Sequence, residues 1–242
     1  MDILADHDPA AFALVAAIHG GDLDALRALL AADPARANVR VGVEDRGWRT
    51  PLLMATDWPG YFPHAPESVA LLLQGGADPN VSTGGGQPET PLHWAASTDD
   101  LEVAELLVDA GADLDVPGGS IGTPLENAVG YGCWHVARLL AARGARIDGL
   151  WVAGGLGDLH RIGELLATSP PPPAGDIGAG FWQACHGGQR RAAELLLAAG
   201  ADPNARVEWA SDSPLDVAGN VDTRREGLAK WLQSIGARPA SE

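Results

Sequence analysis

Two short motifs alternate along this chain at a nearly constant spacing, and that regularity limits its fold more than any other feature. A Thr-Pro-Leu or Ser-Pro-Leu motif and a Gly-Ala-Asp motif stand at 50–52, 76–78, 90–92, 111–113, 123–125, 200–202 and 213–215. Thr90 and Thr123 are 33 residues apart, and so are Gly111 and Gly144. Self-similarity at such a period indicates a repeat architecture, in which each unit buries its apolar face against its neighbours.

The residues of each period predict a pair of helices. Threonine can cap a helix through its hydroxyl, proline suits the first helical position, and the leucine begins the buried face. An alanine five residues after the threonine keeps that face small, so neighbouring helices can approach closely. Paired leucines such as Leu106-Leu107 mark the second helix, and a glycine such as Gly111 ends it in the left-handed conformation.

The fullest copy is the segment 90–96, Thr-Pro-Leu-His-Trp-Ala-Ala, followed by Leu106-Leu107 and then Gly-Ala-Asp at 111–113. It resembles the ankyrin repeat, whose unit is a β-turn plus two helices at this period. The resemblance implies an all-α fold, an α-solenoid with short β-hairpin fingers, and one ankyrin repeat domain filling residues 1–242. We expect about seven repeats, at approximately 10–40, 46–82, 86–115, 119–148, 148–170, 177–206 and 209–238.

Two repeats depart from the pattern. The second is about five residues longer than the third between its two motifs, and the surplus falls in 57–64, a turn-rich aromatic loop. The fifth lacks Thr-Pro-Leu and ends in four consecutive prolines, 170–173. Consecutive prolines cannot continue a helix and favour an extended segment, so we expect a local break or bend of the solenoid there.

The charge balance excludes two classes of partner. The chain carries 32 acidic against 16 basic residues, a formal net charge of −16. Nucleic-acid binding needs a basic footprint that neutralises phosphates, and an anionic membrane surface repels such a chain. An acidic surface steers basic proteins toward itself, so a basic protein partner remains open.

The rest of the composition indicates a cytoplasmic protein. Cys133 and Cys185 lie in different repeats and give no disulfide framework, which fits a reducing compartment. The acidic segment 1–8 is unlike a signal peptide, and no apolar run approaches the roughly 18 residues needed to span a bilayer. The abundance of alanine, glycine and arginine beside a single lysine, Lys230, suggests a bacterial source.

The resemblance also indicates where a partner would bind. In ankyrin arrays the usual binding surface is the concave side, made by the hairpin tips and the inner face of each first helix. Counted from the threonine, positions +4 and +8 face away from the buried +2, +5 and +9. Four of the eight tryptophans fall in these columns or in the adjacent +3 column, namely Trp58, Trp94, Trp151 and Trp182.

Tryptophan is enriched at binding hot spots because it buries a large area and still offers an N–H donor. We therefore expect these rings to line a groove; the alternative is that they fill gaps between imperfect helices. Arginines in a finger would place positive charge at one end of this surface. The full set of expected partner- or ligand-binding residues is Arg46, Arg49, Trp58, His93, Trp94, Glu126, Asn127, Tyr131, Trp151, Trp182 and His186.

His93 and Glu126 occupy the same position in consecutive repeats. By the resemblance, His93 is a hydrogen-bonding strut between turns, and Glu126 replaces that histidine in the next repeat. Adjacent repeats stack about 10 Å apart, so the two side chains can face one another across the groove. A His–carboxylate pair can perform acid–base chemistry, although such contacts are more often structural.

Other chemical motifs are weak. Residues 118–122 match the G-x-S-x-G string, but they lie in a finger rather than at a sheet edge, so Ser120 is not expected to be a nucleophile. The glycines at 84–86 lack the Lys-Ser/Thr ending of a phosphate-binding loop. No Cys/His cluster has zinc-ligand spacing. We expect no catalytic residue, metal or cofactor.

The sequence thus predicts a non-catalytic protein–protein interaction module that binds its partner through the concave face and the fingers. A basic toxin is one concrete partner, and a cytoplasmic enzyme that needs a scaffold is another. The alternative is a small-molecule-binding or enzymatic groove, lined by tryptophans and containing the His93/Glu126 pair. The sequence names neither the partner nor the oligomeric state.

Overall fold

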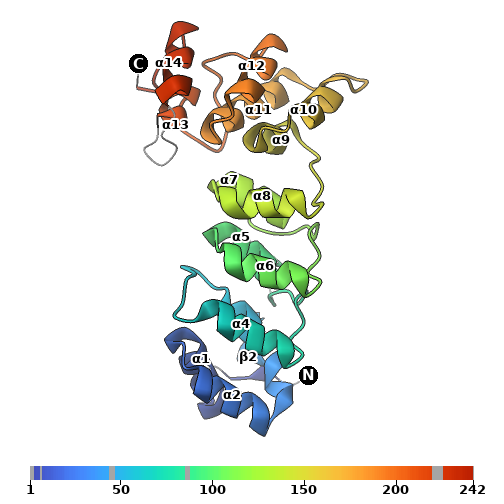
Figure 1. Cartoon of the computed structure of the whole chain (residues 1–242), viewed down its shortest axis with the longest axis vertical. Coiled ribbons are helices and arrows are strands. Elements are labelled where there is room, and N and C mark those ends of the chain that lie inside the picture. The colour runs from blue at the N-terminus through green and yellow to red at the C-terminus, as the bar shows by residue number, and fades with distance from the viewer. Residues whose placement is uncertain (1–2, 6, 44–46, 85–87, 220–225, 242) are drawn as a thin grey trace. The chain divides into compact units, whose positions relative to one another are not determined.

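The computed structural model describes residues 3–5, 7–43, 47–84, 88–219 and 226–241. The chain divides into two compact units, Met1–Arg146 and Ile147–Glu242, which are described separately. Each unit is built from antiparallel helix pairs, which confirms the predicted all-α repeat fold (Figure 1).

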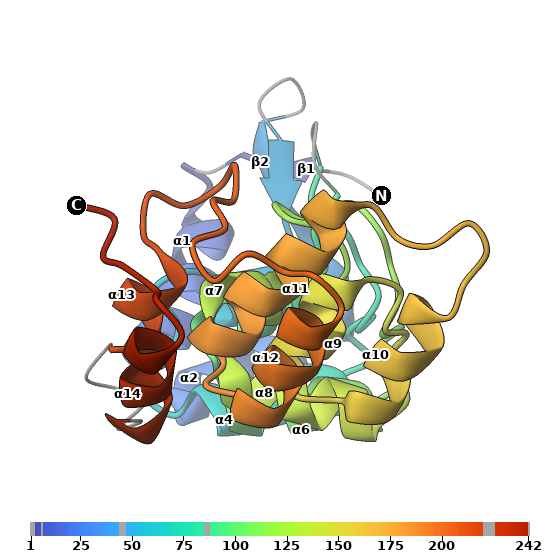
Figure 2. The same ribbon diagram turned by 90° about the horizontal axis from the view of Figure 1, so that it is seen from above.

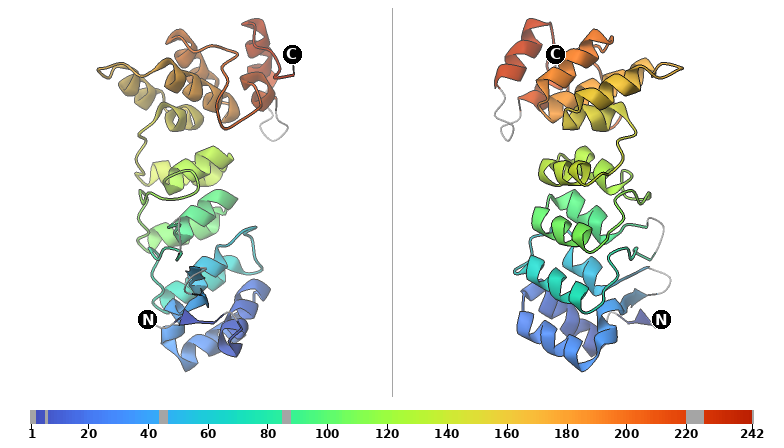
Figure 3. Two further views of the ribbon diagram at one scale, coloured as in Figure 1. Left: turned by 180° about the vertical axis from the view of Figure 1, so that it is seen from behind. Right: turned by 45° about the vertical axis from the view of Figure 1, so that its right-hand side comes forward.

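The described residues of the first unit form four helix pairs stacked as successive layers (Figures 1 and 3). The first helix of each pair packs on the first helix of the next, and the second helices pack among themselves in the same way. We call the first helices inner and the second helices outer. The pairs are α1 (Pro9–Gly20) with α2 (Leu23–Ala32), α3 (Pro51–Ala55) with α4 (Ala65–Gln74), α5 (Pro91–Thr98) with α6 (Leu101–Asp109), and α7 (Pro124–Tyr131) with α8 (Trp134–Ala142).

A small sheet forms the first finger of this unit. Strand β2 (Arg40–Val43) follows the short 3-10 helix η1 (Pro34–Asn38) and pairs antiparallel with β3 (Gly47–Arg49), which confirms a β-hairpin finger at this place. Strand β1 (Ile3–Leu4) adds to β2 in parallel, a pairing that the repeat pattern did not predict. Figure 2 shows β1 and β2 at the edge opposite the outer helices α4, α6 and α8.

The inner helices begin as the Thr-Pro motif predicts, with proline in the first turn. The hydroxyl of Thr123 accepts from the N–H of Glu126 at 3.3 Å, and Ser213 caps its helix in the same way. At Thr50 the prediction of a hydroxyl cap is wrong, because this buried hydroxyl has no hydrogen-bond partner among the described residues. Proline and burial of the neighbouring leucines are sufficient to start that helix.

Asparagine side chains link one repeat to the next beside the Gly-Ala-Asp motif. The amide of Asn80 donates to the carbonyl of Gly111 at 3.1 Å, and its oxygen accepts from the N–H of Asp113 at 2.7 Å. Asn38 makes the same pair of hydrogen bonds one repeat earlier, and Asn204 makes it in the second unit. The motif therefore fixes the spacing between neighbouring repeats as well as the turn within one.

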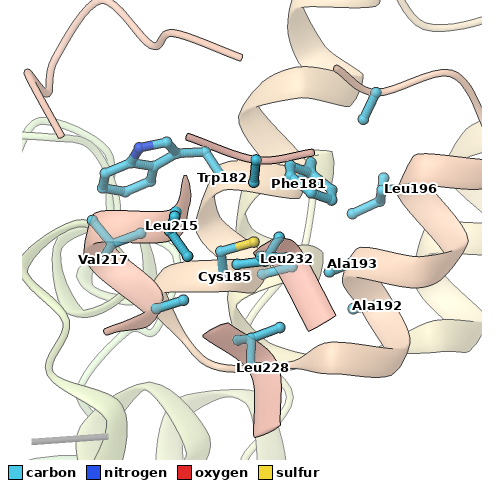
Figure 4. Close-up of a cluster of buried hydrophobic side chains, with 14 of the residues drawn as sticks. Phe181, Trp182, Cys185, Ala192, Ala193, Leu196, Leu215, Val217, Leu228 and Leu232 are labelled. Carbon is cyan, nitrogen blue, oxygen red and sulfur yellow. The ribbon is translucent and has the colours of Figure 1, made fainter. Parts of the chain in front are cut away.

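The second unit contains three further helix pairs around one buried apolar cluster (Figure 4). Phe181 is the largest fully buried side chain in it, and small residues such as Ala184 and Ala193 separate the helices. The pairs are α9 (Leu150–Leu156) with α10 (Leu159–Leu166), α11 (Ala174–His186) with α12 (Arg190–Ala198), and α13 (Pro214–Ala218) with α14 (Glu226–Ser234).

The proline run does not separate the inner helices α9 and α11, so the expected break there is wrong, while the alternative of a bend stays a prediction. Residues 170–173 form the connection between α10 and α11, and α11 starts directly after Pro173. Helices α9 and α11 pack directly on one another. A Cβ added to Gly154 would lie 2.3 Å from the carbonyl oxygen of Gly180, so glycine allows this close approach.

This close approach gives a stability prediction. Gly154→Ala should lower the free energy of unfolding by about 1–3 kcal/mol, because the new methyl group meets backbone that cannot move aside cheaply. Gly163→Ala, in the neighbouring helix α10, is the matched control: nothing lies within 4 Å of its added Cβ. That change should stabilise the chain by about 0.5–1 kcal/mol. Urea unfolding of both variants measures the two effects, and equal effects would contradict the packing argument.

Candidate interaction surface

The aromatic loop 57–64 of the second repeat is anchored on both of its neighbours. Phe62 stacks on the ring of His19 in the first repeat, with centroids 4.4 Å apart and planes 12° from parallel. The hydroxyl of Tyr61 donates to the carbonyl of Asp99 in the third repeat at 2.7 Å. Trp58 takes part in neither contact, and its side chain is 80% exposed.

A chain of contacts runs from this loop along the inner helices. The guanidinium of Arg49 forms an ion pair with Asp57 and lies over the ring of Trp94, 4.9 Å from its centroid. The indole N–H of Trp94 donates to one carboxylate oxygen of Glu89 at 2.8 Å. The other oxygen of Glu89 accepts from the backbone N–H of Ser120 at 2.9 Å.

The chain of contacts continues into the fourth repeat. The hydroxyl of Tyr131 and the amide of Asn127 both donate to the hydroxyl oxygen of Ser120, at 3.1 Å and 3.3 Å. The side-chain oxygen of Asn127 accepts from the backbone N–H groups of Ile121 and Gly122 at 3.0 Å and 3.2 Å. The buried Asn127 therefore shapes the finger, while Tyr131 stays 53% exposed above it.

We call this surface the inner-face strip and define it as Arg49, Trp58, Trp94, Ser120 and Tyr131. All of its members except Ser120 are among the predicted binding residues. Arg46, also predicted, lies outside the described residues. Asn127 is fully buried beneath the strip, so the expectation that it touches a partner directly is corrected.

His93 and Glu126 do not form the expected pair, because each is committed to its own helix start. The ring of His93 is fully buried; its Nδ1 accepts from the N–H of Thr90 at 3.1 Å and its Nε2 donates to the carbonyl of Gly122 at 3.1 Å. The carboxylate of Glu126 accepts from the N–H of Thr123 at 2.8 Å. Both residues close a capping box, in which the third helical side chain reaches back to the N-cap N–H.

In the second unit, Trp182 is also unavailable to a partner. It is 5% exposed, and its indole N–H donates to the carbonyl of Asp212 at 2.9 Å. Figure 4 shows its ring beside Leu215 and Val217, at the margin of the apolar cluster. The alternative interpretation, that tryptophan fills space between helices, is therefore the correct one at this position.

The remaining predicted residues also lie in the second unit. The ring of His186 lies 5.2 Å from that of Trp182, and Trp151 is half-buried at the start of α9. The units are not placed relative to each other, so these residues are not joined to the inner-face strip. Because Trp182 is buried, it does not line the expected array-wide groove, and the part of that expectation that concerns Trp151 stays a prediction.

Two exposed aromatic residues escaped the sequence analysis. Phe12 is 71% exposed and stands four residues after Asp8, which caps α1 ahead of Pro9. Because aspartate caps as well as threonine does, Asp-Pro was the available signal, and it places Phe12 in the +4 column. Trp209 is 59% exposed and packs edge-on against Trp182 at 6.4 Å, in a finger with no motif to mark it.

Stacked helix pairs linked by fingers define a helical repeat protein. Residues 60–149 match the family model described as ankyrin repeats (3 copies). Two of the relatives found are named as ankyrin repeat proteins as well, and residues 60–149 of this chain are similar to ankyrin repeats.

Three relatives illustrate the likeness. Ankyrin repeat and SOCS box protein 16 of Mus musculus is 39% identical over 87 residues, which is 33% of this chain and 19% of that protein. Ankyrin repeat and MYND domain-containing protein 1 of Mus musculus is 29% identical over 201 residues, 71% of this chain and 21% of that protein. Transient receptor potential cation channel subfamily A member 1 of Homo sapiens is 35% identical over 68 residues, which is 28% of this chain and 6% of that protein. The matched part is thus about a fifth or less of each relative.

The family match indicates a protein–protein interaction module. Within the described ranges, no helix is both long and apolar enough to cross a membrane. Among the same residues, no group of three or more His, Cys, Asp or Glu side chains is placed to hold a metal ion.

The burial of His93 predicts a pH dependence of stability. Burial lowers the pKa of this ring below its ordinary 6.5, although the Gly122 carbonyl opposes the shift. Between the two pKa values the unfolded chain binds the proton and the folded chain does not, so folding is penalised. The free energy of unfolding should therefore fall as the pH decreases from 7 through 6.5, in urea titrations at several pH values. His93→Gln should be less stable at pH 7 but should lose part of this slope; an unchanged slope would contradict the assignment.

Proposed function

We propose that this protein binds a protein partner through the inner-face strip of its first unit. One observation carries the proposal: the polar groups below the strip hydrogen-bond to one another, while the rings of Trp58 and Tyr131 stay largely exposed. A surface that is already ordered loses little conformational entropy on binding, and exposed aromatic rings supply buried area.

Charge supports a basic partner. The net charge of −16 attracts a cationic protein over long range, and complementary charge speeds association more than it raises affinity. Arg49 is the cation of the strip, and it is neutralised by Asp57. A basic toxin is one version of this partner, and a client enzyme held on a scaffold is another.

The setting that fits this function is a reducing cytoplasm, in a bacterium by the composition. Cys133 and Cys185 are both free thiols and both buried. Burial raises the pKa of the Cys133 thiol to about 11, so its reactive thiolate is scarce at neutral pH. These cysteines are suited to packing.

The proposal is tested by partner capture and titration. The double variant Trp58→Ala/Tyr131→Ala should weaken binding by about 30-fold or more, because truncating hot-spot rings costs about 2 kcal/mol or more in total. Proteins retained by the immobilised wild-type chain are identified by mass spectrometry and produced separately. Isothermal titration calorimetry then measures each affinity at low and moderate salt. The affinity for a basic partner should be lower at moderate salt.

The matched control is Trp209→Ala, which removes from the second unit a ring whose exposure, 59%, lies between those of Tyr131 and Trp58. It should leave the affinity unchanged within twofold, about 0.4 kcal/mol. Circular dichroism confirms that each variant keeps its helices. A partner that binds the double variant as tightly as the wild type would place recognition elsewhere.

A further inference from the structure

A pocket of about 380 Å³ lies where the aromatic loop meets the turn between α5 and α6. It is separate from the inner-face strip, although the loop contributes to both. Its volume is within the range of sites that hold small organic groups, roughly 300–1,000 Å³. The lining residues are Tyr61, Phe62, Ala65, Pro66, Asp99, Asp100, Leu101, Glu102 and His135.

Among the described residues, the lining carries three carboxylates and no lysine or arginine. Asp99 is already committed: it accepts from the backbone N–H groups of His135 and Val136 at 3.0 Å and 2.9 Å, and it contacts the His135 ring at 2.7 Å. The carboxylate of Glu102 is exposed and makes no hydrogen bond or ion pair with any described residue. Glu102 therefore offers an uncommitted negative charge at this pocket.

Asp100 adds a second carboxylate that lacks a cation. It is 7% exposed, and one of its oxygens accepts from the N–H of Val103 at 3.2 Å, which caps α6. Burial raises the pKa of its carboxyl, and the charge of Glu102 adds to the shift. No arginine or lysine lines the pocket to offset that cost. A bound cation would favour the charged form of this buried group.

Aromatic rings form part of the wall beside the carboxylates. Tyr61 and Phe62 both line the pocket, and each is held in place, by Asp99 and by His19 respectively. Burial raises the pKa of the Tyr61 phenol, and the nearby charges of Asp100 and Asp99 add to the shift. Fixed rings beside carboxylates suit a planar guanidinium, which stacks on aromatic faces and pairs with carboxylates, better than a compact ammonium.

We propose that this pocket receives the guanidinium of an arginine side chain presented by the protein partner. The inference rests on the proposed function for the source of the arginine, and it names one side chain that the partner must carry. Glu102 pairs with the guanidinium, the Tyr61 and Phe62 rings flank it, and Asp100 supplies buried negative potential.

The probe is N-acetyl-arginine amide, which isolates the side chain from any partner. Titrated into the ¹⁵N-labelled full chain, it should shift the backbone amide signals of Tyr61, Leu101, Glu102 and His135. N-acetyl-citrulline amide has the same shape without the charge, and it should shift them far less. Glu102→Gln should weaken binding of the arginine probe about threefold, the size expected for loss of one exposed ion pair.

Glu105→Gln is the matched control, because Glu105 is exposed on the same helix one turn later and does not line the pocket. It should leave the affinity for the probe unchanged. Equal binding of the citrulline probe, or equal weakening by the two glutamine variants, would overturn the pocket assignment. A wild-type chain whose pocket signals do not respond to the arginine probe would do the same.

The experiment is independent of the partner. In one outcome, the Trp58→Ala/Tyr131→Ala variant still captures the partner while the arginine probe binds the wild-type chain as described. That result would overturn the proposed role of the inner-face strip and support the pocket proposal. If the probe fails while partner binding depends on the strip, the pocket alone is overturned. Glu102 is exposed and is not the N-cap residue of α6, so Glu102→Gln should keep the fold that both experiments need.

Discussion

Most of the described inner helices of this protein are too short to persist alone, so they depend on the repeats beside them. Helices α3 and α13 have five residues, and α5 and α7 have eight, whereas isolated helices in water are marginal below about 12–15 residues. Small buried side chains such as Ala95, Ala96 and Ala128, each at most 1% exposed, let these helices stack closely. Stability is therefore a property of neighbouring pairs.

Short helices also have a large share of unpaired backbone groups at their ends, and the polar residues of the repeat satisfy them. His93, Glu126 and Asp216 hold the third position of three capping boxes, and Asn80 satisfies backbone groups of the next repeat. A histidine and a glutamate that suggest acid–base chemistry are thus fully occupied in holding the fold together. His93 and Glu126 therefore do not form the pair that such chemistry would need.

The sequence predicted what depends on local pattern and missed what depends on neighbours. The Thr-Pro helix starts, the paired leucines and the extra loop at 57–64 follow from residue types alone, and the structure has all of them. The burial of Trp182 depends on the side chains that surround it, including Trp209 from a later repeat. Continuity across the prolines depends on the contact of Gly154 with Gly180, which joins two helices separated by that run. Such contacts have no signature within a single repeat.

The surfaces proposed for recognition depend on a departure from the repeat. The regular polar positions form caps and hydrogen bonds within the chain. They are therefore not available to distinguish one partner from another. The loop 57–64 is an addition that no helix pair needs, yet it is anchored on the first and third repeats. Trp58 of this loop is exposed, and Tyr61 and Phe62 of the same loop line the pocket that contains the carboxylates. A partner that engages both must match an apolar and a basic feature at a fixed spacing, and that requirement is a stronger source of specificity than net charge alone.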